Sequence, residues 1–198
     1  NNARVPFNDK RFRQALMYAI NREFIAEKIM FGQGVVATGP IHHNTRFYDP
    51  NVKKYAYDPD KAKALLDEMG LKPDGDGVRA TVSMIPLPYG EMPRRIAEYI
   101  KQNLSKVGIA LNLESTDVGG WVSRVGNWDF QMAGNGVFQY ADPAIGVART
   151  YVGSNIRKGV MFSNTSQYNN PKVDELFDLA AKAGDDAQRQ EYYSQVQK

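Results

Sequence analysis

Cysteine is missing from this sequence altogether. Its absence excludes a disulfide framework, a thiolate nucleophile and any metal site built on cysteine. Long apolar runs are also missing, because no stretch approaches the roughly 20 residues that a membrane-spanning helix needs. The net charge is only +3, and no block of lysine or arginine stands behind it. A nucleic-acid surface is therefore not indicated.

The sequence also lacks the motifs that mark common enzyme classes. It contains no Gly-x-Ser-x-Gly elbow, no His-Glu-x-x-His pair and no phosphate-binding loop. Asp and Glu residues could meet in space as an acid pair, but their spacing does not point to one. We predict neither enzyme activity nor a cofactor. The alternative is a hydrolase or transferase domain whose active site is built from loop carboxylates and His42 or His43.

What the sequence does contain is an ordinary globular composition. The 198 residues are 42% hydrophobic and 24% charged, which is enough for one domain with a sizeable core. We therefore predict a single domain over residues 1–198. Residues 188–198 continue a helical pattern with no Gly or Pro to stop it, so we expect the chain to be a fragment of a longer one.

The clearest helix signal lies near the beginning of the chain. Asp9 can cap the first amides of a helix, and Phe7 can fold back onto it as an apolar staple. The residues that share its buried face are Phe12, Ala15, Leu16, Ala19 and Ile20. Asn21 offers a second cap, which predicts two short helices. Arg11 and Arg13 in the first turn oppose the helix dipole, so we expect them to have partners, most plausibly carboxylates.

A strand–helix–strand pattern follows in the middle of the chain. Strands are predicted at 79–85 and 109–113, with a helix over 92–107 between them. Such a unit predicts parallel strands with a right-handed crossover. The other elements predicted are helices at 59–69, around 121–125, after Pro143 and after Pro171, and a strand at 129–133. The fold class is therefore α/β, with a mixed sheet that contains a βαβ unit and is flanked by helices.

Several phrases, in order, resemble a known family. The chain is similar to the extracytoplasmic solute-binding proteins of the peptide/nickel-binding family, which are the capture components of ABC importers. The segments that carry the resemblance are 6–22, 32–34 with 39–41, 57–66, 97–104 with 108–109, 142–143 and 168–174. Any one of them could arise by chance, but together they follow the order of the family.

The resemblance implies a fold and a function. Members of that family have two α/β lobes, of the periplasmic-binding-protein type II kind, that close on a ligand. This chain would be the second lobe, without the first lobe and the hinge. The implied role is to capture a peptide or similar small solute between the lobes and deliver it to ABC permease subunits. We expect a periplasmic or lipid-anchored monomer that is peripheral to the membrane and does not bind nucleic acid.

The resemblance also suggests ligand contacts in the loop before Pro143. An aspartate at the matching Asp-Pro position would make Asp142 the acceptor for a peptide ammonium, although Asp142 could equally cap a helix. Phe138, Tyr140 and Trp121 could form apolar walls, or could belong to the core. Asn135, from the same loop, is also among the predicted ligand contacts.

Two arginines flank this loop. Arg124 and Arg149 could meet a carboxylate ligand, or could be ordinary surface residues, and we include Arg149 among the predicted contacts.

His42 and His43 suggest a nickel or zinc site, because imidazole is a common metal ligand. Adjacent residues in an extended loop point in opposite directions, and no third ligand is marked nearby. We therefore predict no metal site.

Overall fold

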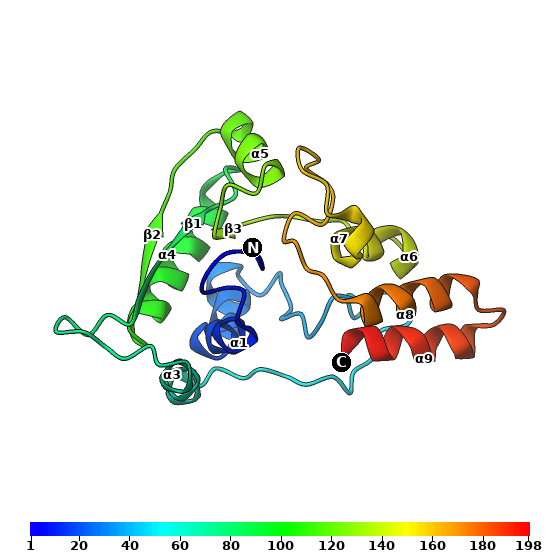
Figure 1. Ribbon diagram of the computed structural model, residues 1–198, viewed down its shortest axis with the longest axis horizontal. Coiled ribbons are helices and arrows are strands. Elements are labelled where there is room, and N and C mark those ends of the chain that lie inside the picture. Colours follow the sequence, from blue (N-terminus) through cyan, green and yellow to red (C-terminus); the bar gives the residue numbers. More distant parts are fainter. The chain divides into compact units, whose positions relative to one another are not determined.

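The computed structural model describes all 198 residues, which form two compact units (Figure 1). Unit 1 and unit 2 each have a hydrophobic core of their own. Unit 1 consists of Asn1–Val36, Tyr55–Val125 and Asp129–Asn135, and unit 2 of Ala37–Lys54, Gly126–Trp128 and Gly136–Lys198. That the whole chain acts as one domain stays a prediction.

Unit 1 is built from a small sheet and the helices that pack with it. Helix α5 ends where unit 1 gives way to unit 2. The elements are α1 (Lys10–Ala19), α2 (Arg22–Phe24), the π-helix η1 (Ile25–Ile29), α3 (Pro59–Glu68), β1 (Ala80–Ile85), α4 (Glu91–Ser105), β2 (Ile109–Leu113), α5 (Val118–Gly126) and β3 (Met132–Ala133). Every element predicted in this part of the sequence is present, and the α/β class is confirmed.

The sheet has the strand order β2-β1-β3. Strand β1 pairs in parallel with β2, with Ala80 opposite Ile109, and in parallel with β3, with Met84 opposite Met132. The predicted βαβ unit is therefore confirmed. The prediction of a mixed sheet is wrong, because helices α4 and α5 carry the chain back so that all three strands run the same way.

Strand β3 is shorter than the predicted 129–133. A side chain takes the place of the backbone beside β1, since the Ser83 amide donates to Gln131 Oε1 at 2.8 Å. The backbone carbonyl of Gln131 is occupied as well, because the N-terminal ammonium of Asn1 donates to it at 2.9 Å. The ladder therefore begins only at Met132.

Helix α1 begins as its sequence predicts. The Asp9 side chain accepts from the Arg11 amide at 2.7 Å, and Phe7 packs edge-on against Phe12 with ring centroids 5.1 Å apart. Arg11 also forms an ion pair with Asp9 at 2.6 Å. Arg13 donates to the carbonyl of Phe7 at 2.6 Å, so its observed partner is a backbone acceptor.

A buried asparagine connects α4 to the end of α1. Asn103 donates to the Tyr99 carbonyl at 2.8 Å, and its Oδ1 accepts from the Asn21 amide at 3.2 Å. Asn21 in turn caps α2, because its side chain accepts from the Phe24 amide. The second predicted cap is thereby confirmed, and its backbone is fixed by a residue 82 positions away.

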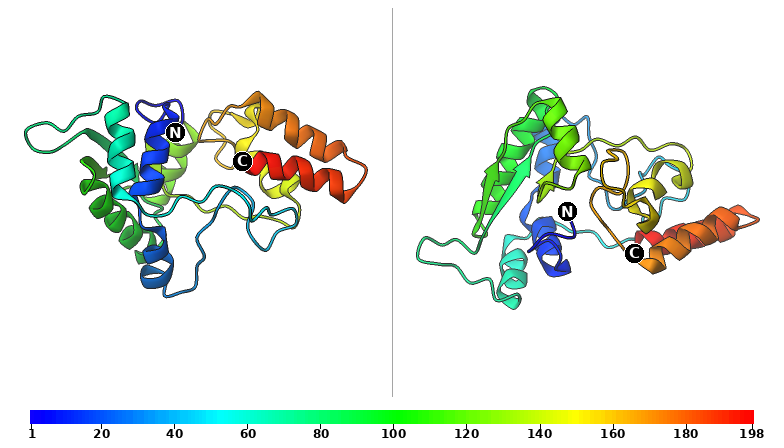
Figure 2. Two further views of the ribbon diagram at one scale, coloured as in Figure 1. Left: turned by 90° about the horizontal axis from the view of Figure 1, so that it is seen from below. Right: turned by 45° about the horizontal axis from the view of Figure 1, so that its top comes forward.

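Unit 2 is mostly helical. Its elements are α6 (Pro143–Gly146), α7 (Ala148–Tyr151), the 3-10 helix η2 (Gly153–Asn155), α8 (Pro171–Lys182) and α9 (Asp186–Gln197). Helices α8 and α9 lie side by side in every view (Figure 2). No helix of either unit combines the length and the hydropathy that crossing a bilayer requires.

Tyr193 lies at the centre of the unit 2 core and is fully buried. Its ring contacts Phe47 and Phe177, with centroids 5.2 and 6.0 Å apart. A buried polar contact lies close by in sequence, where the Ser194 hydroxyl donates to Asp49. Helix α9 is therefore attached through both apolar and polar contacts to the segment that contains Phe47 and Asp49.

Two glycines that end helices allow a test of local packing. Gly70 and Gly108 both have a positive φ, of 77° and 82°. A Cβ on Gly70 would meet nothing, whereas one on Gly108 would come within 2.8 Å of the Gly77 carbonyl oxygen. We expect Gly70→Ala to lower the free energy of unfolding by about 1 kcal/mol through backbone strain, and Gly108→Ala by about 2 kcal/mol more through the clash. Urea unfolding of both variants measures this, and equal losses would contradict the packing argument.

Candidate functional site

Loops gather at one edge of the sheet in unit 1. Parallel strands end at the same edge, so the segments after β1, β2 and β3 start there, and such edges are where open α/β sheets bind ligands. A cavity of about 470 Å³ opens between the first two of these segments. Its lining is Pro86, Leu87, Pro88, Gly90, Arg94, Glu98, Leu113, Glu114, Ser115 and Thr116.

A charged cluster holds the loops at this edge. Arg124 on α5 forms ion pairs with Glu114 at 2.6 Å and with Asp129 at 3.2 Å. A hydrogen bond with Ser83 lowers the pKa of Glu114; burial opposes that shift, and the contact with Arg124 adds to it. Arg124 is therefore engaged with carboxylates of unit 1 itself.

Trp121 and Asn135, two of the predicted contacts, belong to unit 1. The ring of Trp121 is only 3% exposed, and its Nε1 donates to the Gly134 carbonyl at 3.1 Å. This geometry matches the core alternative for Trp121, since the indole fixes the end of β3. Asn135 is exposed and directly follows that fixed carbonyl.

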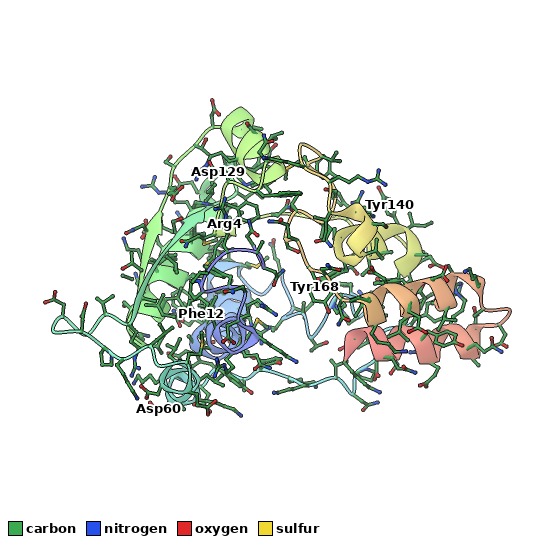
Figure 3. All side chains as sticks on the ribbon, viewed as in Figure 1. Arg4, Phe12, Asp60, Asp129, Tyr140 and Tyr168 are labelled. Carbon is green, nitrogen blue, oxygen red and sulfur yellow. The ribbon has the colours of Figure 1, made fainter.

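Phe138 and Tyr140 belong to the loop of unit 2 that leads into α6. Their side chains are 79% and 54% exposed. Tyr140 can be followed beside α6 in Figure 3. Single exposed aromatic residues are common on protein surfaces, so exposure alone does not mark a binding site. These two residues have the exposure that a ligand contact needs.

Asp142 begins α6 and also reaches α9. Its side chain accepts from the Ala144 amide at 3.0 Å, so the capping alternative is confirmed. Its other oxygen forms an ion pair with Arg189 at 2.6 Å. The Arg189 guanidinium lies over the rings of Phe47 and Tyr193, at 4.8 and 5.7 Å from their centroids. Burial raises the pKa of Asp142, but the Ala144 and Arg189 hydrogen bonds outweigh burial and lower it.

Arg149 lies on the short helix α7. Its backbone carbonyl accepts from the Asn155 side chain at 3.3 Å, and its Nε is buried without a hydrogen-bond partner. Of the six predicted contacts, Phe138, Tyr140, Asp142 and Arg149 belong to unit 2 and lie within 12 residues of one another in the sequence. Trp121 and Asn135 are in unit 1.

The sequence analysis missed two candidate functional residues. Gln139 accepts from the His42 amide at 2.7 Å and donates to the Pro40 carbonyl at 2.6 Å. Arg189 is 47 residues from its partner Asp142. No local pattern signals either contact, because both join segments far apart in the sequence.

The histidine pair behaves differently from its prediction. The rings of His42 and His43 contact each other with centroids 4.1 Å apart, so the expectation that they point in opposite directions is wrong. The Asn44 amide donates to His42 Nδ1 at 3.2 Å, which fixes the orientation of that ring. No group of three or more His, Asp or Glu side chains is placed to hold a metal ion.

The two contacts of Asp142 can be separated by substitution. Asn is also a good N-cap, so Asp142→Asn removes the charge and keeps the cap, whereas Asp142→Ala removes both. We expect Asp142→Asn to cost about 1–2 kcal/mol of unfolding free energy and Asp142→Ala about 1 kcal/mol more. Urea unfolding is the measurement. The control is Asp60→Asn, whose exposed ion pair with Lys63 should matter little. Equal stability of wild type and Asp142→Ala would refute the assignment.

Acid should remove the ion-pair part of this stability. The pKa of Asp142 is lowered in the folded protein, and an unfolded Asp has a pKa of about 3.9. The contribution is therefore complete above about pH 5, and it is lost as the pH falls below about 4 through the folded pKa. We expect the difference in unfolding free energy between wild type and Asp142→Asn to shrink in that range. A difference unchanged down to pH 2 would contradict this.

Comparison with known proteins identifies relatives of this chain. The chain is 31% identical over 193 residues to the dipeptide-binding protein of Escherichia coli K12, covering 97% of this chain and 35% of that protein. It is 28% identical over 201 residues to heme-binding protein A of Haemophilus influenzae, covering 100% of this chain and 35% of that protein. The chain thus spans about a third of the length of these relatives.

A solved structure shows the same fold. The oligopeptide-binding protein AppA of Bacillus subtilis, in complex with a nonapeptide, matches 100% of this chain and 40% of its own, with a TM-score of 0.84 at 27% identity. Residues 1–159 match the model of the bacterial extracellular solute-binding proteins, family 5, middle part. Because that match covers well over half of the sequence, the chain belongs to the family 5 bacterial extracellular solute-binding proteins.

Proposed function

We propose that this chain is one lobe of the substrate-binding component of an ABC importer. In this role, the whole protein captures a peptide or similar small solute between two lobes and delivers it to the permease. The observation that carries the proposal is the family match over residues 1–159. The fold match of this whole chain to 40% of a nonapeptide-bound protein adds to it. The named relatives are binding proteins, and no observation favours the hydrolase or transferase alternative.

The proposed mechanism is ligand-driven closure. A solute that contacts both lobes binds the closed form more tightly, so its binding shifts the protein toward closure, and the permease then meets the closed form. The chain would work as a monomer outside the cytoplasm, peripheral to the membrane or held by a lipid anchor, without a cofactor and without nucleic acid. No catalytic step is required of it.

Within this lobe, the exposed residues are the best candidates for contact with the solute. Phe138 and Tyr140 offer open aromatic faces, and Asn135 offers an exposed carboxamide. Asp142 is already engaged by Arg189, so a solute ammonium would have to share or displace that guanidinium. Trp121 would act indirectly, through the Gly134 carbonyl that its indole holds.

Calorimetry with a defined peptide tests the proposal. The whole protein that carries this chain should bind trialanine or a similar short peptide with micromolar or tighter affinity, whereas this chain alone should bind it weakly or not at all. The isolated chain would lack the contacts that the other lobe makes with the solute. Submicromolar binding by the chain alone would refute the shared-cleft mechanism. A whole protein that binds no peptide and retains no small solute through purification, as seen by mass spectrometry, would refute the function.

Substitution of two exposed phenylalanines tests whether Phe138 contacts the solute. Phe138→Ala in the whole protein should weaken peptide affinity about tenfold or more, because burying a Phe ring contributes about 1.5–3 kcal/mol. Phe162 is also in unit 2 and is 65% exposed, so Phe162→Ala is the matched control and should leave the affinity unchanged. Equal effects of the two substitutions would remove Phe138 from the site.

A further inference from the structure

A single side chain joins two distant segments of unit 2. Gln139 Oε1 accepts from the His42 amide at 2.7 Å, and Gln139 Nε2 donates to the Pro40 carbonyl at 2.6 Å. The two partners lie 97 and 99 positions earlier in the sequence. One carboxamide thus connects the loop before α6 to the segment Pro40–His42, which is far away in the sequence.

The chemistry of the bridge suits an amide. One partner is an N–H and the other a carbonyl, so the connecting group must accept from one and donate to the other. A neutral carboxamide does both, whereas an ionised carboxylate can only accept. A carboxylate at Gln139 would keep the His42 contact and face the Pro40 oxygen with a second acceptor. A protonated carboxyl group would restore the donor.

The loop on either side of Gln139 is held closely as well. A Cβ on Gly146 would lie 2.6 Å from the Tyr140 amide nitrogen and 3.0 Å from Gln139 Cα, so the loop backbone rests directly on α6. Asp142, three residues further along, is fixed by the Ala144 amide and by Arg189. The loop therefore has side-chain anchors at 139 and 142 and a backbone contact between them.

The exposed aromatic side chains flank the bridging residue. Gln139 is half-buried, while Phe138 before it and Tyr140 after it are exposed. With the middle side chain turned inward and bonded at both of its polar atoms, the two rings are turned toward solvent. An aromatic group held in place before binding loses less conformational entropy when a ligand arrives.

We propose that Gln139 is a positioning residue that orients Phe138 and Tyr140 for contact with the solute. This inference rests on the proposed function. Gln139 itself does not need to touch the solute, since both of its polar atoms are occupied within unit 2. Loss of the bridge should free the loop and weaken solute binding without removing any aromatic group.

Gln139→Glu distinguishes a lost hydrogen-bond donor from a general loss of packing, because only the lost donor can be restored by acid. At pH 7.5 the introduced carboxylate cannot donate to Pro40, whereas at pH 4.5 the group can be protonated and the bridge can re-form. The other titratable or charged side chains around the bridge are His42, His43, Arg46, Asp142 and Arg189. Each variant is therefore compared with wild type at the same pH, so that their titration cancels.

Loop mobility is measured on this chain without any ligand. The sequence has no cysteine, so Val137→Cys, which keeps both aromatic residues, accepts a single nitroxide label. We expect Gln139→Ala to shorten the label's rotational correlation time at least about twofold at both pH values. Gln139→Glu should do so at pH 7.5 and recover part of the way toward the wild-type value at pH 4.5, where roughly 40% of carboxyl groups with the ordinary Glu pKa of about 4.3 are protonated. Unchanged mobility in Gln139→Ala, or no recovery of Gln139→Glu in acid, would overturn the proposal.

Affinity is measured in the whole protein with trialanine as the probe. We expect Gln139→Ala to weaken binding about tenfold, because a freed loop must lose on binding the conformational entropy of about one backbone residue. Gln139→Glu should weaken binding more at pH 7.5 than at pH 4.5. Gln188 lies exposed on α9 of the same unit, and Gln188→Ala and Gln188→Glu are the controls expected to change nothing. Wild-type affinity in Gln139→Ala overturns the inference and leaves the function standing. Failure of the wild type to bind counts against the function, while the label still decides the role of Gln139.

Discussion

The parallel pairing of β1 with β2 is the constraint on which the rest of unit 1 depends. Strands that run the same way must be joined by a crossover, and α4 supplies it. The same pairing sends every loop that follows a strand to one edge. Arg124 and the indole of Trp121 then fix those loops by a salt bridge and a hydrogen bond. The cavity at this edge follows from the connection rule, and its charged lining follows from which residues come after each strand.

The loop of unit 2 that leads into α6 follows β3 in the sequence, but it is held in a different way from the loops of unit 1. The loop is held by side chains that reach it from far away in the sequence, Gln139 by its bonds to the Pro40–His42 backbone and Asp142 by its ion pair with Arg189. Arg189 is itself placed by Phe47 and the other buried rings of the core. The position of the loop therefore depends on the packing of α9 as well as on the loop's own residues.

A solute-binding lobe needs this combination of rigid support and exposed side chains. A flexible loop would lose conformational entropy on every binding event, and a fully packed loop would have nothing left to offer a ligand. In this chain the anchors are polar and turned inward, while Phe138 and Tyr140 stay open to solvent. The fold shared with other family 5 proteins supplies the support, whereas the side chains at the loop set what is bound.

Local chemistry by itself determined the start of α1, α3 and α8, because the capping residues Asp9, Asp58 and Asn170 act within three positions of themselves. The βαβ unit was equally predictable, since its periodicity and its parallel pairing follow from short-range rules. The shortened length of β3 was not predictable, because a side chain takes over part of the pairing.

Only the tertiary structure decided the roles of the candidate residues. The sequence left Asp142 as a cap or a ligand acceptor and Trp121 as a wall or a core residue. The cap of α6 and the buried indole became visible only in the fold. Gln139 and Arg189 carried no signal at all, since a hydrogen bond or an ion pair across 47 or more residues depends on how helices pack and not on any spacing along the chain.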